Sequence, residues 1–122
     1  MNKAILFLVS LSMIASAQVP STIPSVSKWQ ISNTIKGNHS EQVCTFTLNH
    51  DDLTGECNSE KETLKINGKV AGKNFSWTYH AKHGFMTLTV VHNGAIDSSK
   101  ITGTVKVDPF GVDGSFTGYP IK

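Results

Sequence analysis

The amino-acid sequence predicts an all-β domain, an eight-stranded antiparallel up-and-down meander barrel. From residue 29 onward, apolar and polar residues alternate in eight short segments, as in strands whose side chains point to opposite faces. The connections between these segments have even length, so the apolar side chains of neighbouring strands meet on one face across each hairpin. No window of a dozen residues shows the three-and-four spacing of an amphipathic helix.

Each strand is predicted from its alternation and from the turn residues at its ends. We place strands at 29–34, 43–48, 53–57, 64–70, 75–79, 86–96, 101–107 and 112–118. Asn93-Gly94 is itself a hairpin signal, but we keep it inside one long strand because Ile96 and Ile101 then pair across the next turn. The inward residues, in chain order, are Trp29, Ile31, Cys44, Phe46, Leu48, Leu53, Cys57, Leu64, Ile66, Val70, Phe75, Trp77, Tyr79, Met86, Leu88, Val90, Ile96, Ile101, Val105, Val107, Val112 and Phe116.

A sheet with one apolar face must fold over on itself to bury that face. A closed barrel also removes the unpaired edges, and the meander connectivity favours it over the alternative, a β-sandwich. The outward face is polar, which is the reverse of a membrane barrel.

The start of the chain resembles a secretory signal peptide over residues 1–17. Lys3 is followed by a short apolar run and by the small residues Ala15-Ser16-Ala17. The run is too short for a membrane span. We therefore expect a secreted or periplasmic protein with an extended N-terminal tail at 18–27, rich in proline and hydroxyl residues, and a β-barrel domain at 28–122.

Composition and motifs exclude several classes of function. Every basic residue is lysine, which argues against a nucleic-acid surface, where arginine is favoured. The sequence lacks a nucleophile elbow, a phosphate loop and an HExxH motif, and its acidic residues fall in loops or on the outer face. We therefore expect no enzyme activity, no catalytic residues and no cofactor.

The two cysteines are expected to form a disulfide. A turn about the bond between residues 50 and 51 pairs Leu48 with Leu53 and Cys44 with Cys57, all pointing inward. An oxidising compartment favours the bond. A metal site at the cysteines would need more ligands than their surroundings offer. His80 and His83 have a spacing that could hold a metal, but they flank a predicted turn at 81–84, where histidines are usually solvated.

His92 is predicted to lie on the apolar face, opposite Val105. Two interpretations stay open. In one, His92 is a core histidine satisfied by a hydrogen bond. In the other, it anchors a ligand together with Asn33, Tyr79 and a tryptophan, Trp29 or Trp77. The inward glycines leave a similar choice: they either mark barrel corners covered by aromatic rings or hollow out a small pocket.

Two family resemblances carry expectations about function. The meander with Trp29 on its first strand, Leu53-Thr54-Gly55 and Asn74-Phe75-Ser76-Trp77 resembles the calycin barrels, which include lipocalins and avidins. That resemblance implies a small apolar or amphipathic ligand inside the barrel.

The second resemblance points to a protein target. Trp29 followed by Cys44-Thr45-Phe46-Thr47-Leu48 resembles the opening of the periplasmic barrels that inhibit secreted metalloproteases. It implies inhibition or protein binding through the N-terminal tail and loops. We expect ligand binding as the main function and keep the tail-mediated function as the alternative.

Overall fold

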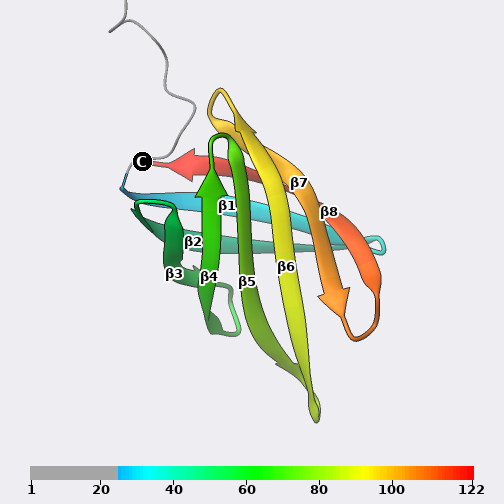
Figure 1. Ribbon diagram of the computed structural model, residues 1–122. Coiled ribbons are helices and arrows are strands. Elements are labelled where there is room, and N and C mark those ends of the chain that lie inside the picture. Colours follow the sequence, from blue (N-terminus) through cyan, green and yellow to red (C-terminus); the bar gives the residue numbers. More distant parts are fainter. Residues whose placement is uncertain (1–24) are drawn as a thin grey trace, which may run out of the picture.

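The structure is a computed structural model that describes residues 25–122. Each strand pairs antiparallel with the next, and β8 pairs back with β1 to close a barrel (Figure 1). This pairing confirms the predicted barrel and excludes the sandwich. No helix of the described part is long and apolar enough to cross a membrane. The strands are β1 (Val26–Ile35), β2 (Asn38–Asn49), β3 (Asp52–Asn58), β4 (Thr63–Ala71), β5 (Asn74–His83), β6 (Met86–Asp97), β7 (Lys100–Asp108) and β8 (Val112–Ile121).

The strands extend beyond their predicted ends. β2 begins at Asn38 rather than at residue 43, and β5 continues to His83 rather than ending at 79. The strand ends were predicted from the alternation of apolar and polar residues, which marks only the buried stretch. The hydrogen bonds between strands continue past that stretch because they do not need apolar side chains. β1 begins at Val26, so it includes the last two residues of the segment predicted as a tail.

β6 runs unbroken through Asn93-Gly94, as predicted. Gly94 pairs with Phe75 on one side and with Gly103 on the other. A Cβ added to Gly103 would lie 2.4 Å from the Cα of Gly94, so the two strands approach closely here because neither residue has a side chain. Pairing on both sides overrides the local turn preference of the Asn-Gly dipeptide.

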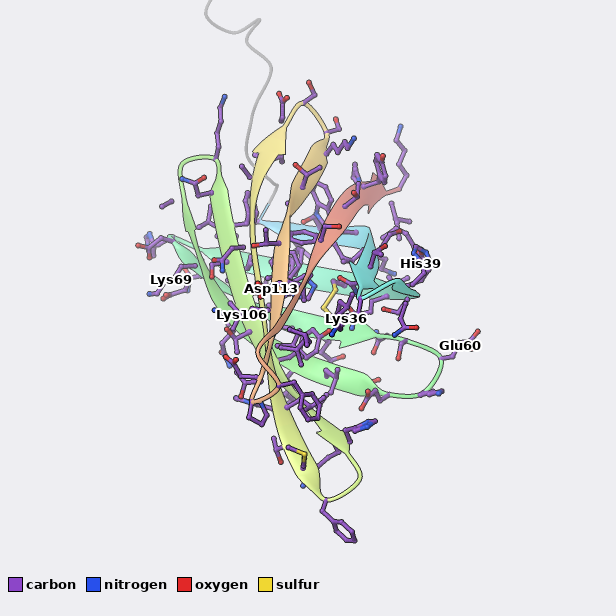
Figure 2. The ribbon with its side chains drawn as sticks, turned by 90° about the vertical axis from the view of Figure 1, so that its right-hand side faces the viewer. Lys36, His39, Glu60, Lys69, Lys106 and Asp113 are labelled. Carbon is purple, nitrogen blue, oxygen red and sulfur yellow. A yellow bond between two sulfur atoms is a disulfide. The ribbon has the colours of Figure 1, made fainter. Side chains whose placement is uncertain are left out.

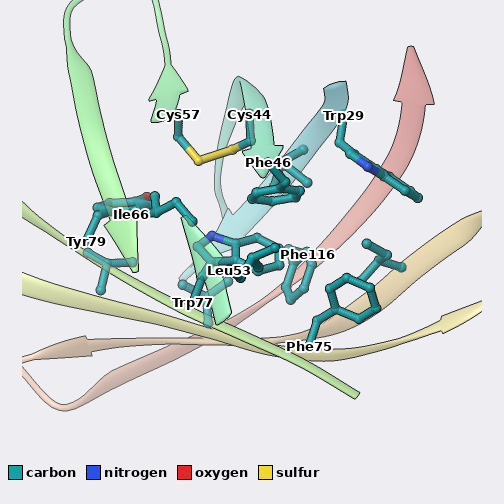
Figure 3. Packing of buried hydrophobic residues seen from close by; sticks show 14 of the residues in the cluster. Trp29, Cys44, Phe46, Leu53, Cys57, Ile66, Phe75, Trp77, Tyr79 and Phe116 are labelled. Atoms are coloured by element: carbon teal, nitrogen blue, oxygen red, sulfur yellow. A yellow bond between two sulfur atoms is a disulfide. The ribbon is translucent and has the colours of Figure 1, made fainter. Parts of the chain in front are cut away.

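Aromatic rings fill the middle of the barrel around Trp77 (Figure 3). The Trp77 ring centroid lies 4.9 Å from that of Phe46 and 5.2 Å from that of Phe116. The predicted inward set forms this core, with one correction. Met86 is exposed, because β6 begins beyond the buried part of the barrel.

Two glycines inside the barrel, Gly68 and Gly94, are positions of close approach between strands or side chains. A Cβ on Gly68 would lie 1.9 Å from the carbonyl oxygen of Ser76, and one on Gly94 would lie 2.9 Å from the ring of Phe116. The Phe116 ring covers Gly94, as the interpretation of covered corners expects, whereas Gly68 lies against the backbone of β5. In the middle of the barrel, the space beside these glycines is occupied.

The predicted disulfide is present. Cys44 on β2 and Cys57 on β3 are directly paired and fully buried, and their sulfur atoms are 2.04 Å apart. The register around them is the predicted one, with Leu48 opposite Leu53.

The two ends of the barrel differ. The first described residue, Ser25, and the C-terminal Lys122 lie at one end, which we call the terminal end, with the turns at 50–51, 72–73 and 98–99. The loops at 36–37, 59–62, 84–85 and 109–111 lie at the other end, which we call the open end. Here the β5–β6 hairpin projects beyond its neighbours (Figure 1), and Phe85 in its turn is fully exposed.

Candidate functional site

A pocket of about 250 Å³ opens at the open end of the barrel. The inward residues of β5 become smaller toward this end, from Trp77 through Tyr79 to Ala81, so the aromatic filling stops short of the rim. The apolar residues lining the pocket are Ile35, Leu64, Ala81, Leu88, Val90 and Val107. The polar lining residues are Asn33, Ser40, Glu41, Gln42, Ser59, Glu62 and Tyr79.

A chain of hydrogen-bonded side chains, which we call the polar floor, lies beneath the pocket: His92, Asn33, Gln42 and Tyr79. The Nε2 atom of His92 lies 2.8 Å from Asn33 Oδ1. Asn33 Nδ2 donates to Gln42 Oε1 at 3.1 Å, and Gln42 Nε2 donates to Tyr79 OH at 3.2 Å. The four side chains come from β6, β1, β2 and β5, and all are buried, so the floor spans the barrel interior.

His92 is a neutral hydrogen-bond donor in this chain. Because the amide nitrogen of Asn33 donates to Gln42, its oxygen faces His92, and Nε2 must carry the imidazole proton. Burial lowers the pKa of His92 to about 3. The ring stacks on Trp77 at a centroid distance of 4.7 Å. Neither His92 Nδ1 nor Trp77 Nε1 has a hydrogen-bond partner within residues 25–122.

Tyr79 keeps its phenolic proton at neutral pH. Burial raises the pKa of Tyr79, the hydrogen bond from Gln42 opposes that shift, and the negative charge of Glu62 adds to it. Tyr79 lines the pocket, as do the two amides of the floor. Each amide uses one of its two N–H groups in the hydrogen bonds above, which leaves each amide nitrogen one further hydrogen to donate. The Gln42 oxygen also accepts a longer hydrogen bond, of 3.5 Å, from Tyr79 OH.

Two of the five residues predicted to bind a ligand, Asn33 and Tyr79, line the pocket. His92 contacts Asn33 from behind and does not line the pocket itself. Trp77 lies beneath them against His92 and does not line the pocket. Trp29 is separate. Its Nε1 donates to Ser27 Oγ at 2.9 Å, and it lies on the other side of Trp77 from Tyr79 (Figure 3). Trp29 therefore does not belong to the pocket.

Gln42 is a member of the floor that the sequence prediction missed. The second strand was predicted to begin at residue 43, so Gln42 fell in a connection. Its position has the same parity as Cys44 and Phe46, which places it on the inward face once the strand is extended. The sequence did contain a signal for it: Gln42 is a polar residue at a position where the alternation places an inward side chain.

The remaining candidate histidines lie outside the pocket. β5 continues through Ala81 to His83, so the turn is formed by Gly84 and Phe85 rather than by the predicted residues 81–84. His80 is exposed and lies 3.2 Å from Thr89 Oγ1, and the His83 ring lies 6.4 Å from that of Phe110. Residues 25–122 contain no group of three or more His, Cys, Asp or Glu side chains placed to hold a metal ion.

No protein-family model matches this chain, and no curated protein matches it. The pocket and its polar floor are therefore the basis on which a function can be proposed. Together they offer an apolar wall, hydrogen-bond donors and acceptors at one end of that wall, and an opening to solvent.

Proposed function

We propose that this protein is an exported, non-enzymatic barrel that binds a small apolar or amphipathic molecule in the pocket at the open end. The observation that carries the proposal is the combination of apolar walls with the polar floor. Ligand pockets are mostly apolar, with a few placed polar groups that fix orientation. An amphipathic molecule would lay its tail along Leu88 and Val107 and bring its polar head to Tyr79 and Gln42.

The pocket sets the size of the ligand. Trp77 and its aromatic neighbours fill the barrel middle, so a ligand cannot pass below the polar floor. At about 250 Å³ the space is smaller than the roughly 300–1,000 Å³ of pockets for drug-sized molecules. We therefore propose a short ligand held near the rim rather than one enclosed against both tryptophans.

The architecture supports the resemblance to calycins. A closed meander of eight antiparallel strands is the fold that this resemblance implies, and barrels of this size have room for one small ligand. We therefore propose for this protein the function that the resemblance implies, which is binding of a small molecule at the mouth of the barrel.

Export forms part of the same proposal. The predicted signal peptide at 1–17 lies outside the described residues. The Cys44–Cys57 disulfide supports a secreted or periplasmic location, because such bonds form and persist in oxidising compartments.

The alternative function, inhibition or protein binding through the N-terminal tail, would use the other end of the molecule. Residues 18–24 of that tail lie outside the described residues. Ser25, which follows them, accepts a hydrogen bond from Leu48 N at the terminal end, opposite the pocket. Deleting residues 18–24 should therefore leave ligand binding unchanged, whereas it would abolish tail-mediated inhibition.

Filling the pocket tests the proposal directly. The neutral probe N-phenyl-1-naphthylamine should bind the wild-type protein with increased fluorescence, and Ala81→Phe should abolish that increase by occupying the pocket. Ala95→Phe is the matched control, because Ala95 lies on the outer face of β6. Thermal melts should show both variants folded. Equal probe binding by wild type and a folded Ala81→Phe variant would show that the pocket is not the site.

A further inference from the structure

We propose that the pocket selects a short amphiphile whose head group is uncharged or positively charged, and that it discriminates against carboxylates such as fatty acids. This inference rests on the proposed function and names the chemical class of ligand for the same site. It comes from the charges around the pocket and from the protonation of its floor.

The charged residues that line the pocket are both acidic. They are Glu41 and Glu62, and no lysine lines this space. The adjoining surface depression is lined by Glu60 and His39 together with Lys61 and Glu41. Glu60 and His39 project on the same side of the barrel (Figure 2).

Glu62 contributes the charge that a ligand would meet. The backbone N–H of Ser59 donates to the Glu62 carbonyl at 2.9 Å and closes the loop between β3 and β4, which holds Glu62 at the rim. Its negative charge contributes to the raised pKa of Tyr79, so its field reaches the polar floor. Glu41 is engaged elsewhere: its carboxylate accepts hydrogen bonds from Ser32 Oγ and from Gln30 Nε2 at 2.7 Å, and it pairs with Nε2 of His39. Within residues 25–122, Glu62 is therefore the lining carboxylate without an ion-pair partner.

The floor itself supplies no positive charge. Asn33, Gln42 and Tyr79 are neutral, and burial keeps the pKa of His92 at about 3, so its imidazole is uncharged at physiological pH. A carboxylate brought to this floor would lose its water without gaining a cation, which is costly. An alcohol exchanges hydrogen bonds with the floor in both directions, and an ammonium group gains the attraction of Glu62.

Three probes with the same apolar chain test the selection: octylamine, octan-1-ol and octanoate. Each is titrated at neutral pH into ¹⁵N-labelled protein, and the side-chain amide signals of Asn33 and Gln42 report on the floor. We expect the amine and the alcohol to shift these signals with dissociation constants about tenfold or more below that of octanoate. Octanoate binding as tightly as the alcohol would overturn the inference and leave the proposed function standing. A failure of all three probes to bind would overturn both.

A pair of charge-neutralising variants tests the role of Glu62. In Glu62→Gln, the preference for octylamine over octanoate should fall by about two- to fivefold, the range of an exposed charge pair. Glu60→Gln removes the same charge from the same loop but outside the pocket lining, and should leave the preference unchanged. Raising the salt concentration should reduce the difference between wild type and Glu62→Gln. An unchanged preference in Glu62→Gln would overturn the assignment of selectivity to this residue.

Discussion

The Nε2 atom of His92 on β6 lies 2.8 Å from Asn33 Oδ1 on β1, although 59 residues separate them and their strands do not pair. The contact therefore links two strands that are separated by β7 and β8 in the barrel wall, and it does so through the interior. It also fixes the tautomer of His92 and completes the floor on which the pocket rests. A ligand at the open end would meet a surface held in place from four strands.

The protein should lose stability as the pH falls from about 6.5 toward 3. His92 has a pKa of about 3 when folded, against its ordinary value of 6.5, so only the unfolded chain binds the proton in that interval. The stabilising contribution is complete above pH 6.5 and decreases as the solution is acidified. We expect the free energy of unfolding to be about 2 kcal/mol lower at pH 5 than at pH 7.5, measured by urea denaturation.

Two variants separate this effect from other titrations. His92→Gln keeps an amide donor at the position and should remove most of the difference between pH 5 and pH 7.5. His80→Gln alters an exposed histidine and should preserve the difference. Glu41 and Asp52 also have lowered pKa values, but carboxyl groups of this kind lose their contribution nearer pH 4. An unchanged pH dependence in His92→Gln would contradict the assignment.

Removing the Cys44–Cys57 disulfide should lower the free energy of unfolding by about 2–3 kcal/mol. The bond links residues 13 apart, and closing a loop of about that size in the unfolded chain has an effect of this order. The measurement compares urea denaturation with and without dithiothreitol. The Cys44→Ala/Cys57→Ala variant is the control, and dithiothreitol should leave its midpoint unchanged.

Adding a methyl group at Gly68 should destabilise the barrel more than adding one at Gly118. At Gly68 the new Cβ would lie 1.9 Å from the backbone oxygen of Ser76, which can move only if β5 moves. At Gly118 the nearest atom, at 2.8 Å, is the flexible end of the Ile31 side chain. We expect Gly68→Ala to cost about 3 kcal/mol and Gly118→Ala about 1 kcal/mol, as thermal or urea unfolding would measure. Equal costs would indicate that the two strand pairs are equally adaptable.

The closed meander, its hairpin registers and the disulfide could be predicted from the sequence because all three depend on the period of two. Once Cys44 and Leu48 are in phase, Cys57 and Leu53 follow from the even turn between them. Strand ends were less predictable. Residues such as Asn38 and His83 continue the hydrogen-bond ladder without being buried, so the alternation of apolar and polar residues does not mark them.

The candidate site was predicted only in part, for a physical reason. The odd or even position of a residue in its strand tells whether its side chain points into or out of the barrel. It does not tell how far along the barrel axis the residue lies, because the strands are staggered. Trp29 and Asn33 share a strand and a face, yet only Asn33 reaches the pocket. Gln42 was missed through the strand boundary. The extent of the pocket depends on where the aromatic side chains stop filling the barrel. That point is known only once the packing of β5 against the other strands is known.

The placement of Ser25 and Lys122 at the end opposite the pocket has a practical consequence. A carrier, a fluorophore or a solid support attached at Lys122 would be separated from the rim by the full height of the barrel. The molecule could therefore be immobilised in an oriented array with every mouth facing the solution. In that form, binding of a probe to the proposed pocket could be measured without obstruction by the attachment.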